Sequence, residues 1–246
     1  MLRPYRADLH VHTCLSPCGE LEMSPRKIVA RARELGLGMI AVCDHNSAAN
    51  TPAVTAAAGA TGVVVLSGME ICSKEEIHLL GIFGNCEAAL AMQAIVYDKL
   101  RGVNDPDAFG LQVIADADDT VAGFEERLLI GAVDMTAEEI AAEIHRQGGL
   151  AIAAHIDRES FSVTSQLGFV PPSLDVDAFE LSPFIGDDEA RGKFGEFVGR
   201  AYIRNSDAHR LAELGRNICA YVLEAPTTAE LRRALRQEEG RSVMRS

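Results

Sequence analysis

Short runs of apolar residues alternate with segments of helical periodicity along most of the chain. The runs at 39–43 and 63–66 are apolar at every position instead of at every second position. This pattern is typical of strands that are covered on both faces, because a strand with one face in water alternates polar and apolar residues. We expect eight strands, at 5–11, 38–43, 62–67, 77–83, 150–154, 177–181, 201–204 and 219–223. The repeated order of strand and helix predicts an α/β fold, either a barrel or a doubly wound sheet.

Helix boundaries are also readable between these runs. Ser24 precedes Pro25. Proline fits the first helical position, because the N–H that it lacks would have no hydrogen-bond partner there. Thr136 followed by Glu139 is a capping-box pattern, and Thr227 followed by Glu230 repeats it. These signals predict three helix starts.

The segment 85–134 interrupts the alternation. A helical pattern over 88–99 is followed by two short runs, 111–115 and 120–124, which flank an Asp-rich turn and indicate a hairpin. The length of 246 residues fits one α/β barrel of roughly 250 residues. We therefore expect a single domain over 1–246 with a helix-hairpin insertion at about 85–134.

The charge of the chain bears on its partners. The 23 basic and 36 acidic side chains give a net charge of −13. Affinity for nucleic acid comes mostly from Lys and Arg that neutralise phosphates, so this balance argues against long nucleic acid, though not against short oligonucleotides. We expect a small phosphorylated substrate instead.

Other features bear on the compartment. No apolar run approaches the roughly 20 residues that cross a bilayer, and the first residues show no secretory signal. The six cysteines form no CxxC pair, so we interpret them as reduced thiols. A cytoplasmic protein without a membrane partner is expected, while nothing in the sequence sets its oligomeric state.

Histidines carry the functional argument. Six of the seven lie at or beside the predicted C-terminal end of a strand, and Glu70 and Asp207 share that position. His145 lies inside a helical pattern and is expected at the surface. Active sites of α/β barrels are built where strands end. His10 and His12 are two apart, so both side chains point to one face of a strand. Imidazole with carboxylate suits zinc, manganese or iron, and burying so many polar groups without a partner would be costly. The pattern predicts a metal site.

Six motifs in this order resemble the PHP superfamily, named for polymerase and histidinol phosphatase. They are Asp8-Leu-His-Val-His-Thr13, Cys43-Asp-His45, Gly68-Met-Glu70, His78-Leu-Leu-Gly81, Ala154-His155 and Asn205-Ser-Asp-Ala-His209. The resemblance spans residues 8–209. It implies a distorted (β/α)7 TIM-like barrel that binds two or three divalent metal ions and hydrolyses phosphoesters.

The resemblance also implies a set of ligands for each metal ion. The first ion would be held by His10, His12, Glu70 and Asp207. Glu70 would bridge to a second ion, held also by His78 and His155. A third ion would use His45, His209 and Cys18.

Cys18 departs from the family pattern, in which many members have Asp at this position of a Ser-x-Asp-Gly loop. A thiolate is a competent zinc ligand, so Cys18 either keeps the third site and makes it softer, or packs in its loop beside a site with two metals. The role of Asp44 also has two interpretations: it either orients a metal ligand or has a structural role.

Two metals about 3.5–4 Å apart lower the pKa of a shared water and clamp a phosphate, which would make the bridging Glu70 a catalytic residue. Arg158 follows a ligand strand and is the candidate for the phosphate oxygens, since a guanidinium binds phosphate with two donors. Its alternative is a surface ion pair with Asp157 or Glu159. Lys74, shortly after Glu70, is a further candidate.

Three functions compete at this point. The expected one is a metal-dependent phosphatase or phosphodiesterase, a hydrolase acting on a small phosphorylated metabolite or nucleotide. The alternatives are an exonuclease on short oligonucleotides and a non-catalytic metal-binding module. The nearly full set of ligands argues against the module.

Overall fold

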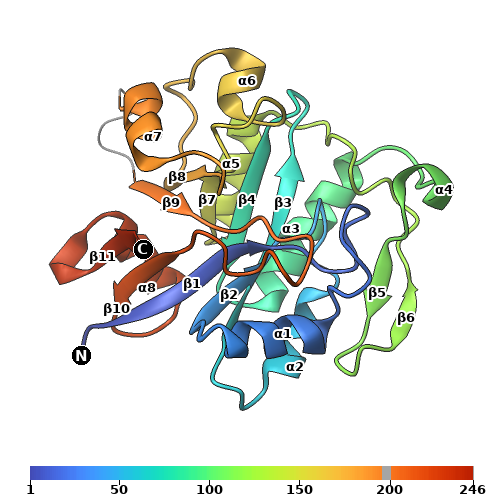
Figure 1. Cartoon of the computed structure of the whole chain (residues 1–246). Helices are drawn as coiled ribbons and strands as arrows, with labels where there is room; N and C mark the ends of the chain where they lie inside the picture. The colour runs from blue at the N-terminus through green and yellow to red at the C-terminus, as the bar shows by residue number, and fades with distance from the viewer. Residues whose placement is uncertain (196–200, 246) are drawn as a thin grey trace.

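A nine-stranded sheet curls into a nearly closed barrel with helices outside it, as Figure 1 shows for the computed structural model, which describes residues 1–195 and 201–245. The strands follow the order β11-β10-β1-β2-β3-β4-β7-β8-β9. They are β1 (Arg3–Val11), β2 (Met39–Val42), β3 (Val64–Cys72), β4 (His78–Phe83), β7 (Leu150–Ala153), β8 (Ala178–Leu181), β9 (Ala201–Arg204), β10 (Cys219–Leu223) and β11 (Ser242–Arg245). The expected α/β barrel is confirmed.

Strand direction explains how one rim of the barrel collects the histidines. Strands β1, β2 and β3 are parallel, as are β7, β8 and β9, while β4 is antiparallel to both of its neighbours. A short connection between β3 and β4 permits only an antiparallel pair, because a parallel one needs a long crossover. As a result β4 begins at the rim where β3 and β7 end, and His78 stands at that rim although it opens its strand.

An irregularity near the end of β1 turns His10, within the strand, and His12, directly after it, toward the barrel interior. Leu9 packs in the interior cluster, whereas Val11 packs outside with Ile28. Residues two apart on a regular strand share a face, so the alternation shifts between them, and the pairing of β1 with β2 is irregular at this point. His10 and His12 therefore both face inward.

The helices cover the outside of the sheet and begin largely where the sequence predicts. They are α1 (Pro25–Glu34), α2 (Thr51–Ala58), α3 (Cys86–Lys99), α4 (Pro106–Phe109), α5 (Ala137–Arg146), α6 (Val163–Leu167), α7 (Asp187–Phe194), α8 (Thr228–Leu235) and the short 3₁₀ helix η1 (Glu238–Gly240). The capping box of Thr136 and Glu139 is formed, and Thr227 caps α8 by accepting the N–H of Glu230. Ser24 precedes α1, but its hydroxyl makes no capping hydrogen bond.

Three details differ from the sequence expectations. Strand β3 runs on to Cys72, so Glu70 lies within it instead of after it. Strand β11 was not expected, because a four-residue run that begins with Ser and ends with Arg gives little apolar signal. The half-buried side chain of His145 donates a hydrogen bond of 2.9 Å to the Asp177 carboxylate, so this histidine joins α5 to the start of β8 instead of lying free at the surface.

The segment 85–134 contains the expected helix, α3, and the expected hairpin, formed by β5 (Val113–Ala115) and β6 (Val121–Phe124). Helix α3 packs on β3 and β4, and the hairpin lies at one side of the barrel in Figure 1. In the described part of the chain, no helix combines the length and the apolar character needed to cross a bilayer.

Candidate metal centre

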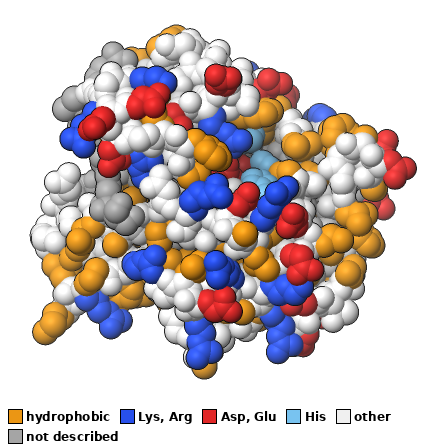
Figure 2. Space-filling model, viewed as in Figure 1, with side chains coloured by type: hydrophobic (Ala, Val, Ile, Leu, Met, Phe, Trp, Pro, Cys, Tyr) orange, Lys and Arg blue, Asp and Glu red, His pale blue; other side chains and the backbone are white. Residues whose placement is uncertain are grey.

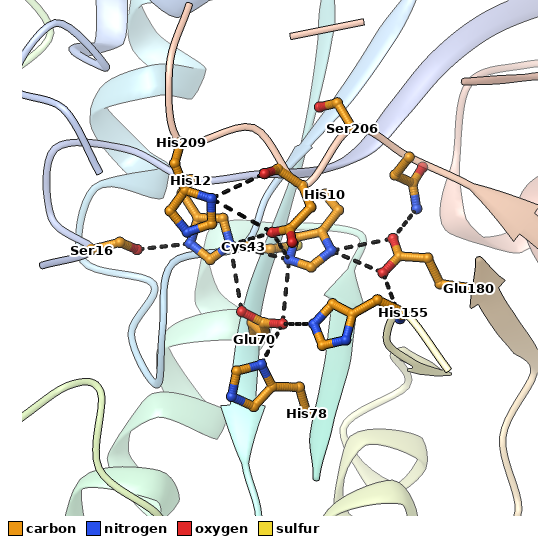
Figure 3. Close-up of polar contacts among 12 residues, drawn as sticks. His10, His12, Ser16, Cys43, Glu70, His78, His155, Glu180, Ser206 and His209 are labelled. Atoms are coloured by element: carbon orange, nitrogen blue, oxygen red, sulfur yellow. Dashed lines mark hydrogen bonds and ion pairs between the residues drawn. The ribbon is translucent and has the colours of Figure 1, made fainter. Parts of the chain in front are cut away.

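The six strand-end histidines gather around one buried carboxylate, that of Glu70, at the rim of the barrel. Figure 3 shows five of them, His10, His12, His78, His155 and His209, around it. The Glu70 side chain is 1% exposed. Five ring nitrogens approach its two oxygens, namely His78 Nδ1 at 2.8 Å, His155 Nε2 at 3.0 Å, His45 Nδ1 at 3.0 Å, His12 Nε2 at 3.4 Å and His10 Nε2 at 3.5 Å. The sixth histidine, His209, stacks on His12 with ring centroids 4.0 Å apart.

The geometry around His10 and His12 shows whether these residues fit a metal ion. Their Nε2 atoms lie 3.1 Å apart, and each is 3.3–3.4 Å from Asp207 Oδ1. Nδ1 of His10 faces the Glu180 carboxylate and Nδ1 of His12 faces the Ser16 hydroxyl, so each Nδ1 carries the hydrogen that its partner accepts. Both Nε2 lone pairs then point at one another and at carboxylates. Such a convergence of acceptors needs a proton or a metal ion between them, and the combination of imidazole and carboxylate fits a metal ion.

Glu180, at the end of β8, supports this arrangement and was missed from the sequence. Its carboxylate lies 3.1 Å from His10 Nδ1, accepts the His155 backbone N–H at 3.0 Å and accepts the Asn205 amide at 2.6 Å. The available signal was a carboxylate in a four-residue strand whose other positions, Ala178, Phe179 and Leu181, are all apolar and buried.

Asp44 acts on the site through Ser16. The Ser16 hydroxyl donates to Asp44 at 2.7 Å and accepts from His12 Nδ1 at 2.9 Å. Asp44 also accepts the Thr13 N–H and hydroxyl, at 2.7 and 2.8 Å. Asp44 therefore has both of the roles considered from the sequence. It holds the loop at Thr13 and, through Ser16, it orients His12.

Backbone strain marks two of the candidate ligands. Asp207 has a φ of +52° and His155 a φ of +28°, values that cost non-glycine residues free energy and are found at functional sites. Asp8 holds the loop around Asp207, since its buried carboxylate accepts the Ser206 N–H and hydroxyl and the Gly215 N–H.

The charges around the cluster shift the pKa values of the neighbouring His10 and His12 in opposite directions. Burial lowers the pKa of His10, but the carboxylates of Glu180, Asp207 and Glu70 outweigh it and raise that pKa well above its usual value. Burial together with His209 holds the pKa of His12 well below its usual value. Burial would raise the pKa of Glu70, but the surrounding histidines lower it, and Glu70 stays ionised.

Cys18 lines the same cavity as His45 and His209. Desolvation would raise the pKa of its thiol, but hydrogen bonds with His209 and His45 outweigh that effect and lower the pKa to about 6. An exposed cysteine with a depressed pKa is a thiolate at neutral pH and has the form that binds metals.

The cavity has a volume of about 310 Å³, and the histidines are visible at its base in Figure 2. Its lining residues are Cys18, His45, Glu70, His78, Ile130, His155, Arg158, Phe161, Asp207 and His209. Arg158 donates a hydrogen bond of 2.6 Å to Asp207 Oδ2. The alternative from the sequence, a surface ion pair with Asp157 or Glu159, is not formed within the described residues 1–195. The exposed Lys74 is absent from the described lining residues.

Among the residues that the structure describes, three groups of side chains are close enough to hold one ion each. They are His10 with His12 and Glu70, His45 with Glu70 and His78, and His12 with His45 and His209. The first contains three of the four ligands that the resemblance implies for its ion and lacks Asp207. The other two differ from the implied sets in one member each, with His45 in the place of His155 and His12 in the place of Cys18.

Comparisons with known proteins extend these observations. The PHP domain model matches residues 8–148, more than half of the chain. A 5′-3′ exoribonuclease from Haemophilus influenzae is 28% identical over 188 residues, which cover 60% of this chain and 68% of that protein. A lesion-specific endonuclease from Pyrococcus furiosus superposes with a TM-score of 0.72 at 19% identity, over 98% of this chain and 58% of the endonuclease.

A complex of endonuclease Q corrects the expectation about partners. This structure contains a 27-mer duplex substrate with an abasic lesion at the active site, and superposes with a TM-score of 0.68 at 20% identity, over 98% of this chain and 58% of that chain. The expectation of a small phosphorylated substrate and no long nucleic acid is therefore wrong. It rested on the net charge of the whole chain, whereas binding of phosphate depends on the charges at the site.

The chain spans 58% of the length of the two endonucleases, and its likeness to them is one of fold. The family itself is shown by the sequence match over residues 8–148, which contains four of the six motifs. The chain belongs to the PHP domain family of metal-dependent hydrolases.

Proposed function

We propose that the chain is a metal-dependent phosphodiesterase that removes nucleotides from the end of an oligonucleotide. The observation that carries the proposal is the convergence of six histidines and two acidic side chains at the base of an open cavity that also holds Arg158. The likeness to the exoribonuclease supports nucleic acid as the substrate class.

In this proposal the metal ligands are the cluster that surrounds Glu70. They are His10, His12, His45, Glu70, His78, His155, Asp207 and His209, with Cys18 as a ninth ligand. Two or three zinc, manganese or iron ions held there would supply an activated water and neutralise charge on the phosphate. Glu70 suits the bridging role because both of its oxygens already have imidazole neighbours, at 2.8 Å on one side and 3.0 Å on the other.

Arg158 binds the phosphate in this scheme. Its side chain is 43% exposed, so it can leave Asp207 for an incoming phosphate without a large desolvation cost. A guanidinium offers paired donors to two non-bridging oxygens and keeps its charge at any working pH. Its place beside Asp207 brings the phosphate next to the metal ligands.

Glu180, Ser16 and Asp44 keep the ligands in position before any substrate arrives. Glu180 holds the hydrogen of His10 on Nδ1, and Ser16 does the same for His12, so that both Nε2 atoms remain acceptors. The geometry of the site is thus set by hydrogen bonds of the chain itself.

The test is an assay of 5′-phosphorylated RNA and DNA oligonucleotides, an abasic duplex and nucleoside monophosphates, each with Mn²⁺ and with Zn²⁺. Glu70→Gln serves as the inactive control. The expected result is stepwise release of mononucleotides by the wild-type protein and no release by Glu70→Gln. Release of phosphate from nucleoside monophosphates, with oligonucleotides left intact, would instead favour a phosphatase acting on nucleotides. No turnover of any of these substrates would contradict the proposal.

A further inference from the structure

Two apolar side chains, Phe161 and Ile130, stand among the polar residues that line the cavity. Each is 37% exposed, so water reaches both. They come from different parts of the chain, since Phe161 follows β7 and Ile130 belongs to the insertion between β6 and α5. An apolar wall next to candidate metal ligands has no evident part in activating water, and it points to recognition of an apolar part of a ligand.

The Phe161 ring lies against the metal centre. Its centroid is 4.7 Å from that of His78, with an angle of 20° between the planes. His78 in turn contacts Glu70 at 2.8 Å. Because one face of the Phe161 ring covers His78 and the residue still lines the cavity, the open face is directed to the space above the ligands.

The loop that carries Phe161 is held rigidly. The Phe161 carbonyl accepts the His78 N–H at 2.9 Å, Arg158 N–H donates to the His155 carbonyl at 2.9 Å, and the Ser162 hydroxyl donates to the Arg158 carbonyl at 2.7 Å. Phe161 has a φ of +59°, a conformation that a bulky residue adopts only where its surroundings impose it. The backbone that carries Phe161 and Arg158 is therefore held in place before a ligand binds.

We propose that Phe161 is a stacking platform for a nucleobase of the substrate, with Ile130 as the apolar wall of the same subsite and Arg158 on the adjoining phosphate. This inference rests on the proposed function and names its specificity-determining residue. A flat, apolar face that is open to the cavity matches the face of any base, so the subsite distinguishes nucleotides from base-free phosphates and tolerates all four bases.

Binding to the Mn²⁺-loaded chain tests the proposal without turnover. Calorimetry compares adenosine 5′-monophosphate with ribose 5-phosphate, which has the phosphate and sugar but no base. We expect the nucleotide to bind about 5- to 100-fold more tightly, as stacking on an aromatic side chain would give. Phe161→Leu should remove this preference and leave the affinity for ribose 5-phosphate unchanged, while Phe161→Tyr should retain the preference.

The matched control is Phe169→Leu, because Phe169 is 58% exposed and the described lining of the cavity does not include it. This control should bind both ligands as the unchanged chain does. Equal affinities of the unchanged chain for the two ligands, or a preference that survives in Phe161→Leu, would overturn the proposal.

A second readout covers the case in which Phe161→Leu misfolds or loses metal. The chain contains no tryptophan, so Phe161→Trp introduces a single tryptophan at the platform, whose fluorescence can be excited selectively over that of the tyrosines. Adenosine 5′-monophosphate should quench its fluorescence, and ribose 5-phosphate should not; equal responses would overturn the proposal. Failure of oligonucleotide hydrolysis would refute the proposed function but leave these binding ratios interpretable.

Discussion

The Nδ1 atom of His10 lies 3.1 Å from the carboxylate of Glu180, and both side chains are buried. Glu180 also accepts the backbone N–H of His155 and the amide of Asn205. One carboxylate thus joins β1, the end of β7 and the loop after β9 directly beneath the candidate ligands. The position of the His10 ring depends on this contact as well as on any metal.

Glu180→Gln should weaken metal binding about 10- to 100-fold, as loss of an outer carboxylate partner typically does. The amide keeps the size of the side chain but removes the charge that raises the pKa of His10. The measurement is a titration with Zn²⁺ against a competing chelator. Glu189→Gln, on the exposed face of α7, is the matched control. An unchanged affinity in Glu180→Gln would limit Glu180 to a structural role.

Much of this site follows from sequence patterns, because histidines that end the strands of a barrel gather at one rim, and residues two apart share a face of a regular strand. The placement of His78 shows the limit of that reasoning, since the apolar run at 77–83 predicts a strand but not its direction. Glu180 shows another: a carboxylate within a buried strand can be located from sequence, but its three partners come from β1, β7 and residue 205, and only the fold brings them together. The shift in β1 between Leu9 and Val11 is likewise invisible in the apolar pattern.

Cys18 should react with iodoacetamide at a lower pH than an ordinary thiol. Because its pKa is lowered to about 6, the thiolate predominates above pH 6, and the rate in the metal-free chain should reach half of its plateau near that pH. Burial raises the pKa of Cys14 and Cys72 to about 12, so these two should stay unmodified at pH 7. Peptide mass spectrometry over a pH series measures the rates. Half-maximal modification near pH 9 would contradict the expected thiolate.

Bound metal should protect Cys18 from this reaction if the thiolate is a ligand. Cys18→Ala should then bind one ion fewer, and Cys18→Asp should restore the count with a preference shifted toward Mn²⁺, because a carboxylate oxygen is a harder ligand than sulfur. Elemental analysis of the three proteins gives the answer. The same metal content in the unchanged chain and in Cys18→Ala would make Cys18 a packing residue.

Arg158→Ala should lower kcat/KM for phosphodiesters about 10- to 100-fold, the effect of losing charged hydrogen bonds to the phosphate. Its Tm should stay the same, since the ion pair with Asp207 is half-exposed on the arginine side and such pairs contribute little stability. Arg146→Ala, which removes an exposed arginine of α5, is the control. Unchanged kinetics in Arg158→Ala would exclude the arginine from phosphate binding.

Glu70→Gln should lose metal and activity together. A neutral amide cannot bridge two cations as a carboxylate does, and the repulsion between the ions would go unbalanced. Activity should fall by at least about 100-fold, the loss typical of removing one catalytic group. The matched change Glu22→Gln, at an exposed position, should leave both quantities as they are. A fully active Glu70→Gln would remove Glu70 from the catalytic site.

Anomalous diffraction from crystals grown with Zn²⁺ tests the metal centre most directly. The account predicts peaks at the rim of the barrel, one of them about 2.0–2.2 Å from Nε2 of His10, Nε2 of His12 and an oxygen of Glu70, the usual lengths of bonds from nitrogen and oxygen to zinc. Fully occupied zinc elsewhere on the molecule, with no peak between His10 and His12, would contradict it.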